Sequence, residues 1–344
     1  MRVIYSEDHR LHDGGKELIG GELVPQFEKP SRMDMVLAAL DARGFDDRVT
    51  PERIGLGPAR RVHSDDYLDF LAVAWDRWTA EMPDQDFALA FTFGMRRLRQ
   101  EPGRSIHQQL GWYAFDAAAP LVAGSWQAIQ SSLDCAMTAQ RLVAAGAQSA
   151  FALCRPPGHH AMRDMAGGYC YINNAAAAAQ AFVDAGAARV AILDVDYHHG
   201  NGTQDIFYDS DRVLFVSLHG HPDQEYPYFA GHESETGAGA GAGFNHNYPL
   251  AWGTGWEGYG AALDDGLAKI AAYRPDALVV SLGVDTFEQD PISHFKLTSP
   301  DYLTLGAKIG GLGLPSLFVM EGGYAVEEIG INTVNLLQGY ADRA

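Results

Sequence analysis

Short apolar segments rich in Val, Ile, Leu and Phe recur along the chain, and Ala-rich segments separate them. The apolar segments are RVIY (2–5), SAFALC (149–154), RVAILDV (189–195), RVLFVSLH (212–219), ALVVSLGV (277–284) and SLFVMEGG (316–323). Continuous runs of this kind are typical of strands buried on both faces of a parallel sheet. Residues 173–186 and 259–273 have the pattern of helices. The alternation predicts a doubly wound α/β fold.

One long segment, residues 75–125, departs from this alternation and mixes aromatic residues, Arg and Pro without a clean period. Such segments are usually lids, interfaces or disordered, and the aromatic content disfavours disorder. We expect an excursion that forms a homodimer interface, because large rings and Arg are favoured in interface cores. The alternative is that the segment folds back on its own subunit. No low-complexity linker interrupts the chain, so we predict one domain over residues 1–344.

Composition limits the class of partner. The 344 residues include 25 Lys and Arg against 44 Asp and Glu, a net charge of −19. This charge argues against unaided binding of nucleic acid, which needs a basic surface. It is compatible with a cationic substrate and also with an ordinary acidic cytoplasmic protein.

The location of the protein is predicted from what its sequence does not contain. No apolar run approaches the roughly 20 residues of a membrane span, and the first residues do not resemble an export signal. The three cysteines, Cys135, Cys154 and Cys170, are widely spaced, which suggests reduced thiols. We therefore expect a cytoplasmic protein that has no membrane partner.

Polar residues collect where the predicted strands end. RPPGHH (155–160) follows one strand and DVDYHHG (194–200) ends another, while VDTF (284–287) and EGGY (321–324) complete two more. Ligand sites of parallel α/β sheets lie beyond the carboxyl ends of the strands. The sequence therefore predicts a functional site at this edge of the sheet.

The pattern at residues 194–198 predicts a metal site. On an extended backbone Asp194, Asp196 and His198 project to one face, and Asp285 is the best candidate for a further ligand. An Asp/His/Asp set leaves coordination positions open for water and substrate. Each residue alone is also consistent with a capping Asp or a buried His. Position 287 is Phe, so we favour one metal ion over two.

Two further groups are candidates for chemistry. His159 and His160 follow Pro-Pro-Gly, a rigid turn that suits groups held in place, although a turn with exposed histidines is the alternative. Tyr324 follows two glycines, which predicts a flexible segment from which its hydroxyl could swing toward a polarised carbonyl. The alternative is a buried tyrosine that closes a strand.

Taken together, the motifs RPPGHH, GGYCYINN, LDVDYHHGNGTQDIFY, SLGVDTFEQDPI and MEGGY resemble the signature blocks of the zinc-dependent histone deacetylase superfamily. The chain is most similar to its bacterial acetylpolyamine amidohydrolase branch. YSEDHRLH, GGELVPQFEKP and SPDYLTLG extend the resemblance over nearly the whole chain. The resemblance implies the arginase–deacetylase α/β fold, with a central parallel sheet of about eight strands flanked by helices.

The resemblance also implies ions and their ligands. It implies one catalytic Zn²⁺ held by Asp196, His198 and Asp285, although such a donor set also accepts Fe²⁺ or Co²⁺. It implies structural K⁺ held partly by backbone carbonyls. The residues that match the K⁺ sites are Asp194, Asp196, His198, Ser217, Leu218 and, for a second site, Phe207.

The resemblance gives the two histidines different roles. His159 faces Asp194, which favours its imidazolium form. His160 faces the uncharged Asn201 and should keep the lower pKa, so that it acts as general base and then as acid to the leaving amine. Tyr324 would stabilise the developing oxyanion.

The sequence predicts the type of reaction more specifically than it predicts the substrate. The resemblance places Tyr169 and Tyr226 as aromatic walls of a substrate tunnel, with Gly168 and Ile292 beside them. Such walls would surround the methylene chain of a small acetylated amine. Residues 75–125 resemble an insertion that narrows the mouth of polyamine deacetylases. Glu17 is acidic, but His107 stands where a carboxylate is expected for long polyamines, so a short acetylated diamine or another small amide fits as well.

Three other functions remain open on the sequence. A wider mouth would suit a protein deacetylase that acts on acetyl-lysine. A catalytically inactive relative could serve as a binding module, which the complete set of ligands, histidines and Tyr324 opposes. A dimanganese ureohydrolase would need more bridging carboxylates than the motifs supply.

Overall fold

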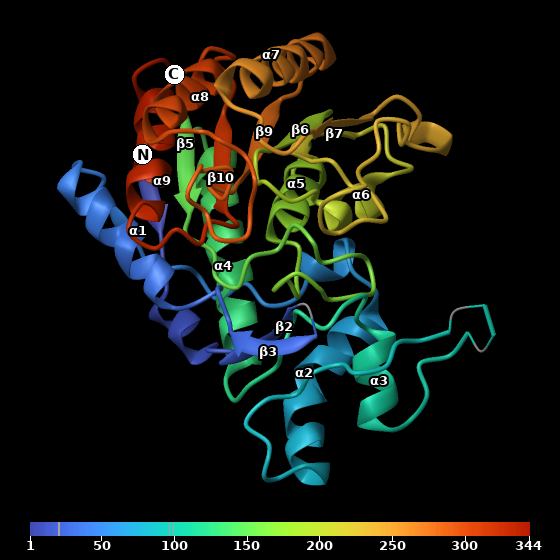
Figure 1. The fold of residues 1–344 in the computed structure, drawn as a ribbon. Coiled ribbons are helices and arrows are strands. Elements are labelled where there is room, and N and C mark those ends of the chain that lie inside the picture. Colours follow the sequence, from blue (N-terminus) through green and yellow to red (C-terminus); the bar gives the residue numbers. More distant parts are fainter. Residues whose placement is uncertain (20, 96, 99) are drawn as a thin grey trace.

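A sheet of eight parallel strands forms the centre of the molecule (Figure 1). The computed structural model describes residues 1–19, 21–95, 97–98 and 100–344. The strand order is β4-β1-β5-β10-β9-β6-β7-β8, and each neighbouring pair is parallel. The strands are β1 (Arg2–Ile4), β4 (Arg48–Val49), β5 (Ser149–Ala152), β6 (Val190–Asp194), β7 (Val213–Gly220), β8 (Asn245–Leu250), β9 (Ala277–Leu282) and β10 (Ser316–Met320).

Helices cover both faces of this sheet and bury alternate residues of each strand. The helices α1 (Ser31–Ala42), α7 (Trp256–Tyr273), α8 (Ser299–Gly310) and α9 (Ile329–Ala341) contribute to one core. The helices α2 (Asp65–Glu81), α3 (Ile106–Trp112), α4 (Ser125–Ala144), α5 (Asn174–Asp184) and α6 (Asn201–Phe207) contribute to the other. On β6, Ile192 joins one core and Leu193 the other, as the two-residue period of a strand requires.

The predicted helices and strands are present, and local sequence explains their ends. The helix predicted over 173–186 is α5, which begins after Asn173, whose side chain accepts a hydrogen bond from Ala176 N. An Asx cap followed by a run of alanines is a strong helix start. All six predicted strands are found, and the structure adds the short β4 and the polar β8.

The excursion predicted over residues 75–125 has a later start than expected. Residues 75–81 are the last turns of α2, and Trp78 and Tyr113 are buried in the chain's own core. The loop between α2 and α3 projects from the body, as Figure 1 shows, and exposes Phe91 and Phe93. The aromatic residues are thus divided between this subunit's core and its surface.

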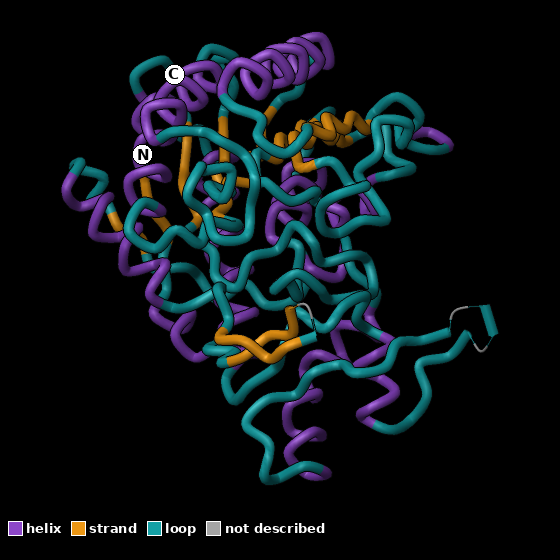
Figure 2. The backbone as a smooth tube through the Cα atoms, in the orientation of Figure 1, coloured by secondary structure: helices purple, strands orange, loops and turns teal. Residues whose placement is uncertain are grey.

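Loops fill the side of the molecule beyond the carboxyl ends of the strands (Figure 2). Below them lies a hairpin of β2 (Lys16–Ile19) and β3 (Glu22–Pro25). The four central strands, β5, β10, β9 and β6, are followed by the segments that carry the predicted chemical residues. No helix in the described part of the chain has the length and apolar character that crossing a membrane requires.

Candidate active site

Asp196, His198 and Asp285 form a buried cluster beyond the ends of β6 and β9. One ligand atom of each lies within 4.8 Å of the others, and His198 Nδ1 is 3.1 Å from Asp285 Oδ2. Among the described residues, no Lys or Arg forms an ion pair with either carboxylate. Two buried carboxylates need compensating positive charge, and among the described residues only imidazoles lie at ion-pair distance from them, so the donor set fits a divalent metal ion.

Backbone groups hold the two carboxylates in place. Tyr197 N donates to Asp285 Oδ1 at 2.7 Å, and Gly322 N donates to Asp196 Oδ2 at 2.8 Å. A Cβ at Gly283 would lie 2.1 Å from Asp196 Oδ2, so this close approach requires glycine. The positions of both carboxylates are therefore set by backbone groups that directly follow β6 and β10.

The tandem histidines lie in the turn after β5 and face different partners. His159 Nδ1 is 3.0 Å from Asp194 Oδ2, whereas His160 Nδ1 is 2.7 Å from Asn201 Oδ1. Burial lowers the pKa of His159, but the charges of Asp194 and Asp196 outweigh burial and raise it above its ordinary value. Burial and the charges of His159 and His198 hold the pKa of His160 well below its ordinary value. The expected difference between the two imidazoles is present.

Tyr324 lies at the cavity, and its turn is more firmly held than the two glycines predict. Arg32 Nε donates to Gly323 O at 2.7 Å, and Tyr324 N donates to Asp290 Oδ2 at 2.7 Å. The side chains of Arg32 and Asp290 thus anchor the backbone of this turn through hydrogen bonds, which the sequence did not predict. Burial, only partly offset by Arg32, raises the pKa of Tyr324 well above its ordinary value. The hydroxyl thus keeps its proton at neutral pH.

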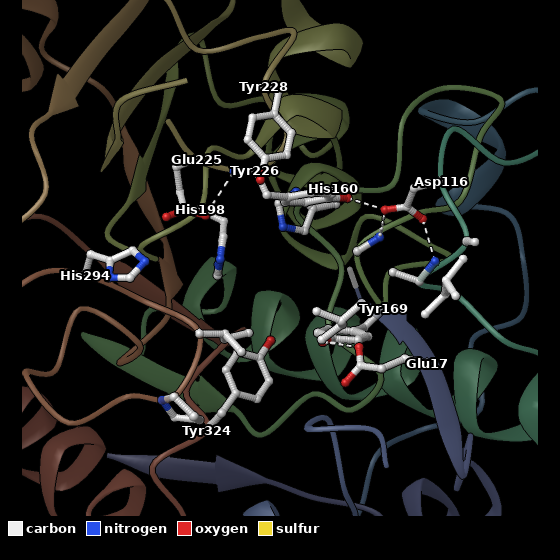
Figure 3. A pocket seen from close by; sticks show the side chains of 17 residues that line it. Glu17, Asp116, His160, Tyr169, His198, Glu225, Tyr226, Tyr228, His294 and Tyr324 are labelled. Carbon is white, nitrogen blue, oxygen red and sulfur yellow. Dashed lines mark hydrogen bonds between the residues drawn. The ribbon is translucent and has the colours of Figure 1, made fainter. Parts of the chain in front are cut away.

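A cavity of about 520 Å³ opens onto these groups (Figure 3). His160, His198 and Tyr324 border it, together with the predicted Glu17, Gly168, Tyr169, Tyr226 and Ile292. Gly168 has φ +53, and a Cβ there would lie 2.4 Å from His160 Cδ2. The structure thus brings together most of the predicted substrate-contacting residues.

Three carboxylates border the cavity, and the described residues that line it include no Lys or Arg. Tyr169 Oη donates to Glu17 Oε2 at 2.5 Å, and Tyr226 Oη donates to Asp116 Oδ2 at 2.6 Å. Burial, partly offset by these hydrogen bonds, raises the pKa of both carboxyls. Glu225 is the third. The cavity is therefore an acidic environment suited to a cation.

Asp116, Glu225 and His294 were not among the predicted site residues. All three lie in loops, and no motif in the sequence distinguishes them. His107 does not border the cavity in this chain. It lies on α3, where its ring packs edge-to-face against Trp78 and Phe91, so a role for it in substrate contact stays a prediction.

Three of the residues predicted for structural K⁺, Asp194, Ser217 and Leu218, lie on β6 and β7. Asp194 is the register partner of Ser217, and Leu218 follows on the same strand, fully buried. Phe207 ends α6, and its carbonyl accepts a hydrogen bond from Ser210 N at 3.0 Å. Asp194 is thus placed both beside His159 and beside the predicted cation site.

Comparisons with known proteins agree with this geometry. A model of the histone deacetylase domain matches residues 26–339. Acetylpolyamine amidohydrolase 1 of Pseudomonas aeruginosa is 59% identical over the full length of both chains. Acetylpolyamine amidohydrolase of Mycoplana ramosa is 54% identical, with 99% of this chain and all of the relative covered.

A solved structure agrees as well. The crystal structure of acetylpolyamine aminohydrolase from Burkholderia pseudomallei superposes with a TM-score of 0.95 at 39% identity, covering 99% of this chain and 98% of that one. The resemblance and the fold predicted from the sequence are thereby confirmed. Because the domain model and the relatives match nearly the whole chain, this protein belongs to the histone deacetylase domain family.

Proposed function

We propose that the protein is a zinc-dependent deacetylase that hydrolyses small acetylated amines. The observation that carries this proposal is the cavity itself, which joins a buried Asp/His/Asp cluster to walls that contain three carboxylates and no Lys or Arg. Three relatives from different organisms carry the name acetylpolyamine amidohydrolase and match this chain almost end to end, which supports the same substrate class.

Zinc is the ion we propose for the cluster of Asp196, His198 and Asp285. Carboxylate and imidazole donors are ordinary zinc ligands, and three of them leave room for substrate. A divalent ion bound there supplies Lewis acidity for an amide carbonyl and lowers the pKa of a water ligand. Fe²⁺ and Co²⁺ suit the same donors, and we further propose structural K⁺ beside Asp194.

The residues around the cluster divide the proton chemistry. His160, neutral because of burial and the positive charge of His159, accepts the proton of the attacking water. His159 stays protonated beside Asp194 and supplies positive charge. Tyr324 donates a hydrogen bond to the carbonyl oxygen as negative charge develops there. His160 then gives its proton to the amine nitrogen as the C–N bond breaks, which releases acetate and the amine.

The walls of the cavity favour a slender cation. Tyr169 and Tyr226 present aromatic surface to a methylene chain, and Glu17, Asp116 and Glu225 supply negative charge for a distal ammonium group. An acetylated diamine or polyamine carries both features. An acetyl-lysine side chain carries only the methylene chain.

We also propose that the protein forms a homodimer through the exposed loop between α2 and α3, which we call the arm. The loop between α2 and α3 exposes Phe91, Met95 and Leu98, each more than 70% accessible. Large apolar side chains exposed together in one loop are a feature of interaction sites. A second copy that covers this arm would also narrow the approach to the cavity.

Acetate release from purified, zinc-loaded protein tests the proposal. The substrates are acetylputrescine, acetylcadaverine, acetylspermidine and an acetyl-lysine peptide. We expect a higher kcat/KM for at least one small amine than for the peptide, loss of activity with a chelator and recovery with zinc. An equal or higher kcat/KM for the peptide would indicate a protein deacetylase, and no hydrolysis of any substrate would indicate a binding module.

A further inference from the structure

Asp290 is a buried carboxylate for which the proposed chemistry has no role. It lies in the loop after β9, five residues beyond Asp285, and only 6% of it is exposed. In the described part of the chain no Lys or Arg forms an ion pair with it. All the hydrogen bonds found for its side chain come from backbone amides instead. Burying a carboxylate is costly unless hydrogen bonds replace its hydration, and these backbone amides do so.

The amides that Asp290 binds belong to two parts of the active site. Its Oδ2 accepts from Tyr324 N at 2.7 Å and from Ala325 N at 3.3 Å. Its Oδ1 accepts from Ile292 N at 3.1 Å. The Asp290 side chain therefore links the backbone of Tyr324 to the backbone of Ile292, which lines the cavity.

The turn before Tyr324 needs such an anchor because of its glycines. Gly323 has φ +129, a conformation open to glycine alone, and glycine has wide backbone freedom. Intrinsic backbone preference therefore does not fix where the Tyr324 side chain begins. Contacts to the turn must do so.

Arg32 and Asp290 bind opposite kinds of group in this turn. Arg32 donates to the carbonyl oxygens of Gly323 and Glu321 at 2.7 and 2.6 Å, and its Cζ lies 4.9 Å from the Tyr324 ring centroid. Asp290 accepts from the amides at the other end of the turn. Loss of Asp290 would leave the carbonyl anchors in place and release the amides of Tyr324 and Ala325 in this turn, together with that of Ile292.

We propose that Asp290 is a positioning residue that holds the Tyr324 hydroxyl at the place where the oxyanion develops. The inference rests on the proposed role of Tyr324. A donor that is already in place loses nothing to reorganisation during the reaction. A displacement of about 1 Å in a catalytic group can cost about 10²-fold in rate. Asp290 thus acts on turnover through Tyr324 and has no contact with the reacting atoms.

A double-mutant cycle with Tyr324→Phe tests this inference. Asp290→Asn and Asp290→Ala are made in the wild-type and Tyr324→Phe backgrounds, and kcat, KM and zinc content are measured with an acetylated diamine. We expect Asp290→Ala to lower kcat by about 10²-fold, with KM and zinc content little changed. Asp290→Asn should retain more activity, because its amide keeps one acceptor oxygen. In the Tyr324→Phe background the further loss should be less than about three-fold, since the two residues act as one unit.

The cycle separates failure of this inference from failure of the proposed function. If Asp290→Ala and Asp290→Asn lower kcat equally in both backgrounds, or not at all, Asp290 does not act through Tyr324. If Tyr324→Phe alone keeps wild-type kcat, the proposed role of Tyr324 is wrong whatever Asp290 does. Should Asp290→Ala not fold, the Asp290→Asn cycle gives the same decision.

Asp134→Ala is the matched control. Asp134 is also a buried carboxylate, and its Oδ1 accepts from a backbone amide, Ile54 N, at 2.9 Å. It does not border the active-site cavity. We expect it to affect stability and leave kcat within about two-fold of wild type, as for distant independent sites. An equal fall in kcat for Asp134→Ala would attribute the Asp290 effect to general loss of structure.

Discussion

The partner of His160 should set the pH at which the enzyme becomes active. Asn201 Oδ1 lies 2.7 Å from His160 Nδ1 and carries no charge. The neighbouring His159 has a carboxylate, Asp194, in the equivalent position. Asn201→Asp would give both histidines a carboxylate partner at nearly constant geometry, and would raise the pKa of His160. Because the general base must be neutral, the acidic limb of the profile should move to higher pH.

The size of this shift follows from the distance between the two groups. Opposite charges about 3 Å apart attract by roughly 5 kcal/mol at an effective dielectric constant of about 20. Burying the new carboxylate opposes ionisation and reduces this gain. One pH unit corresponds to about 1.4 kcal/mol. We therefore expect the acidic limb of kcat/KM to rise by about one to three pH units.

The assay is acetate release from an acetylated diamine across the pH range, with zinc content checked at each end. Asn247→Asp is a matched control, because Asn247 Oδ1 lies 3.2 Å from Nε2 of another buried histidine, His199, which does not border the cavity. The control should leave the acidic limb in place. An unmoved limb for a folded, zinc-loaded Asn201→Asp protein would refute the assignment of His160 as the titrating base.

Three further outcomes are expected. Tyr324→Phe should lower kcat by about 10²–10³-fold with zinc content unchanged in metal analysis, as for other single oxyanion donors; activity within a few-fold of wild type would contradict its role. Glu17→Gln and Glu225→Gln should raise KM for an acetylated diamine and leave an uncharged acetylated alkylamine unaffected, which steady-state kinetics can compare; equal effects on both substrates would argue against charge recognition. Phe91→Asp combined with Leu98→Asp should give a monomer in sedimentation if the arm is the dimer interface, and wild-type protein that sediments as a monomer would disprove that interface.

The parts of the fold that the sequence predicts are those buried on two faces. RVAILDV and ALVVSLGV are rich in apolar residues because helices pack against both faces of the sheet at these strands. The two strands of the central sheet that the sequence did not predict, β4 and β8, lie at its ends. β4 has only two residues, and β8 has the sequence NHNYPL. An edge strand has fewer buried contacts, so its sequence carries a weaker apolar signal.

The same reasoning explains which site residues were found. The metal cluster and the histidines follow central strands directly, so their place in the sequence fixes their place in the fold. Asp116 and Glu225 reach the cavity through long loops, and only tertiary structure brings them there. The proposed role of Asp290 could not be predicted from the sequence for the same reason, because it depends on backbone amides 34 and 35 residues away.

Different parts of this site are suited to catalysis and to substrate selection. His159 and His160 have adjacent rings with centroids 4.0 Å apart, yet one partner is charged and the other is neutral. The roles proposed for the two histidines therefore follow from their partners, Asp194 at the end of β6 and Asn201 at the start of α6. Buried charges hold the backbone of the Tyr324 turn on both sides. We therefore expect discrimination between acetylated amines to come from the acidic walls of the cavity and from the proposed homodimer interface at the loop between α2 and α3.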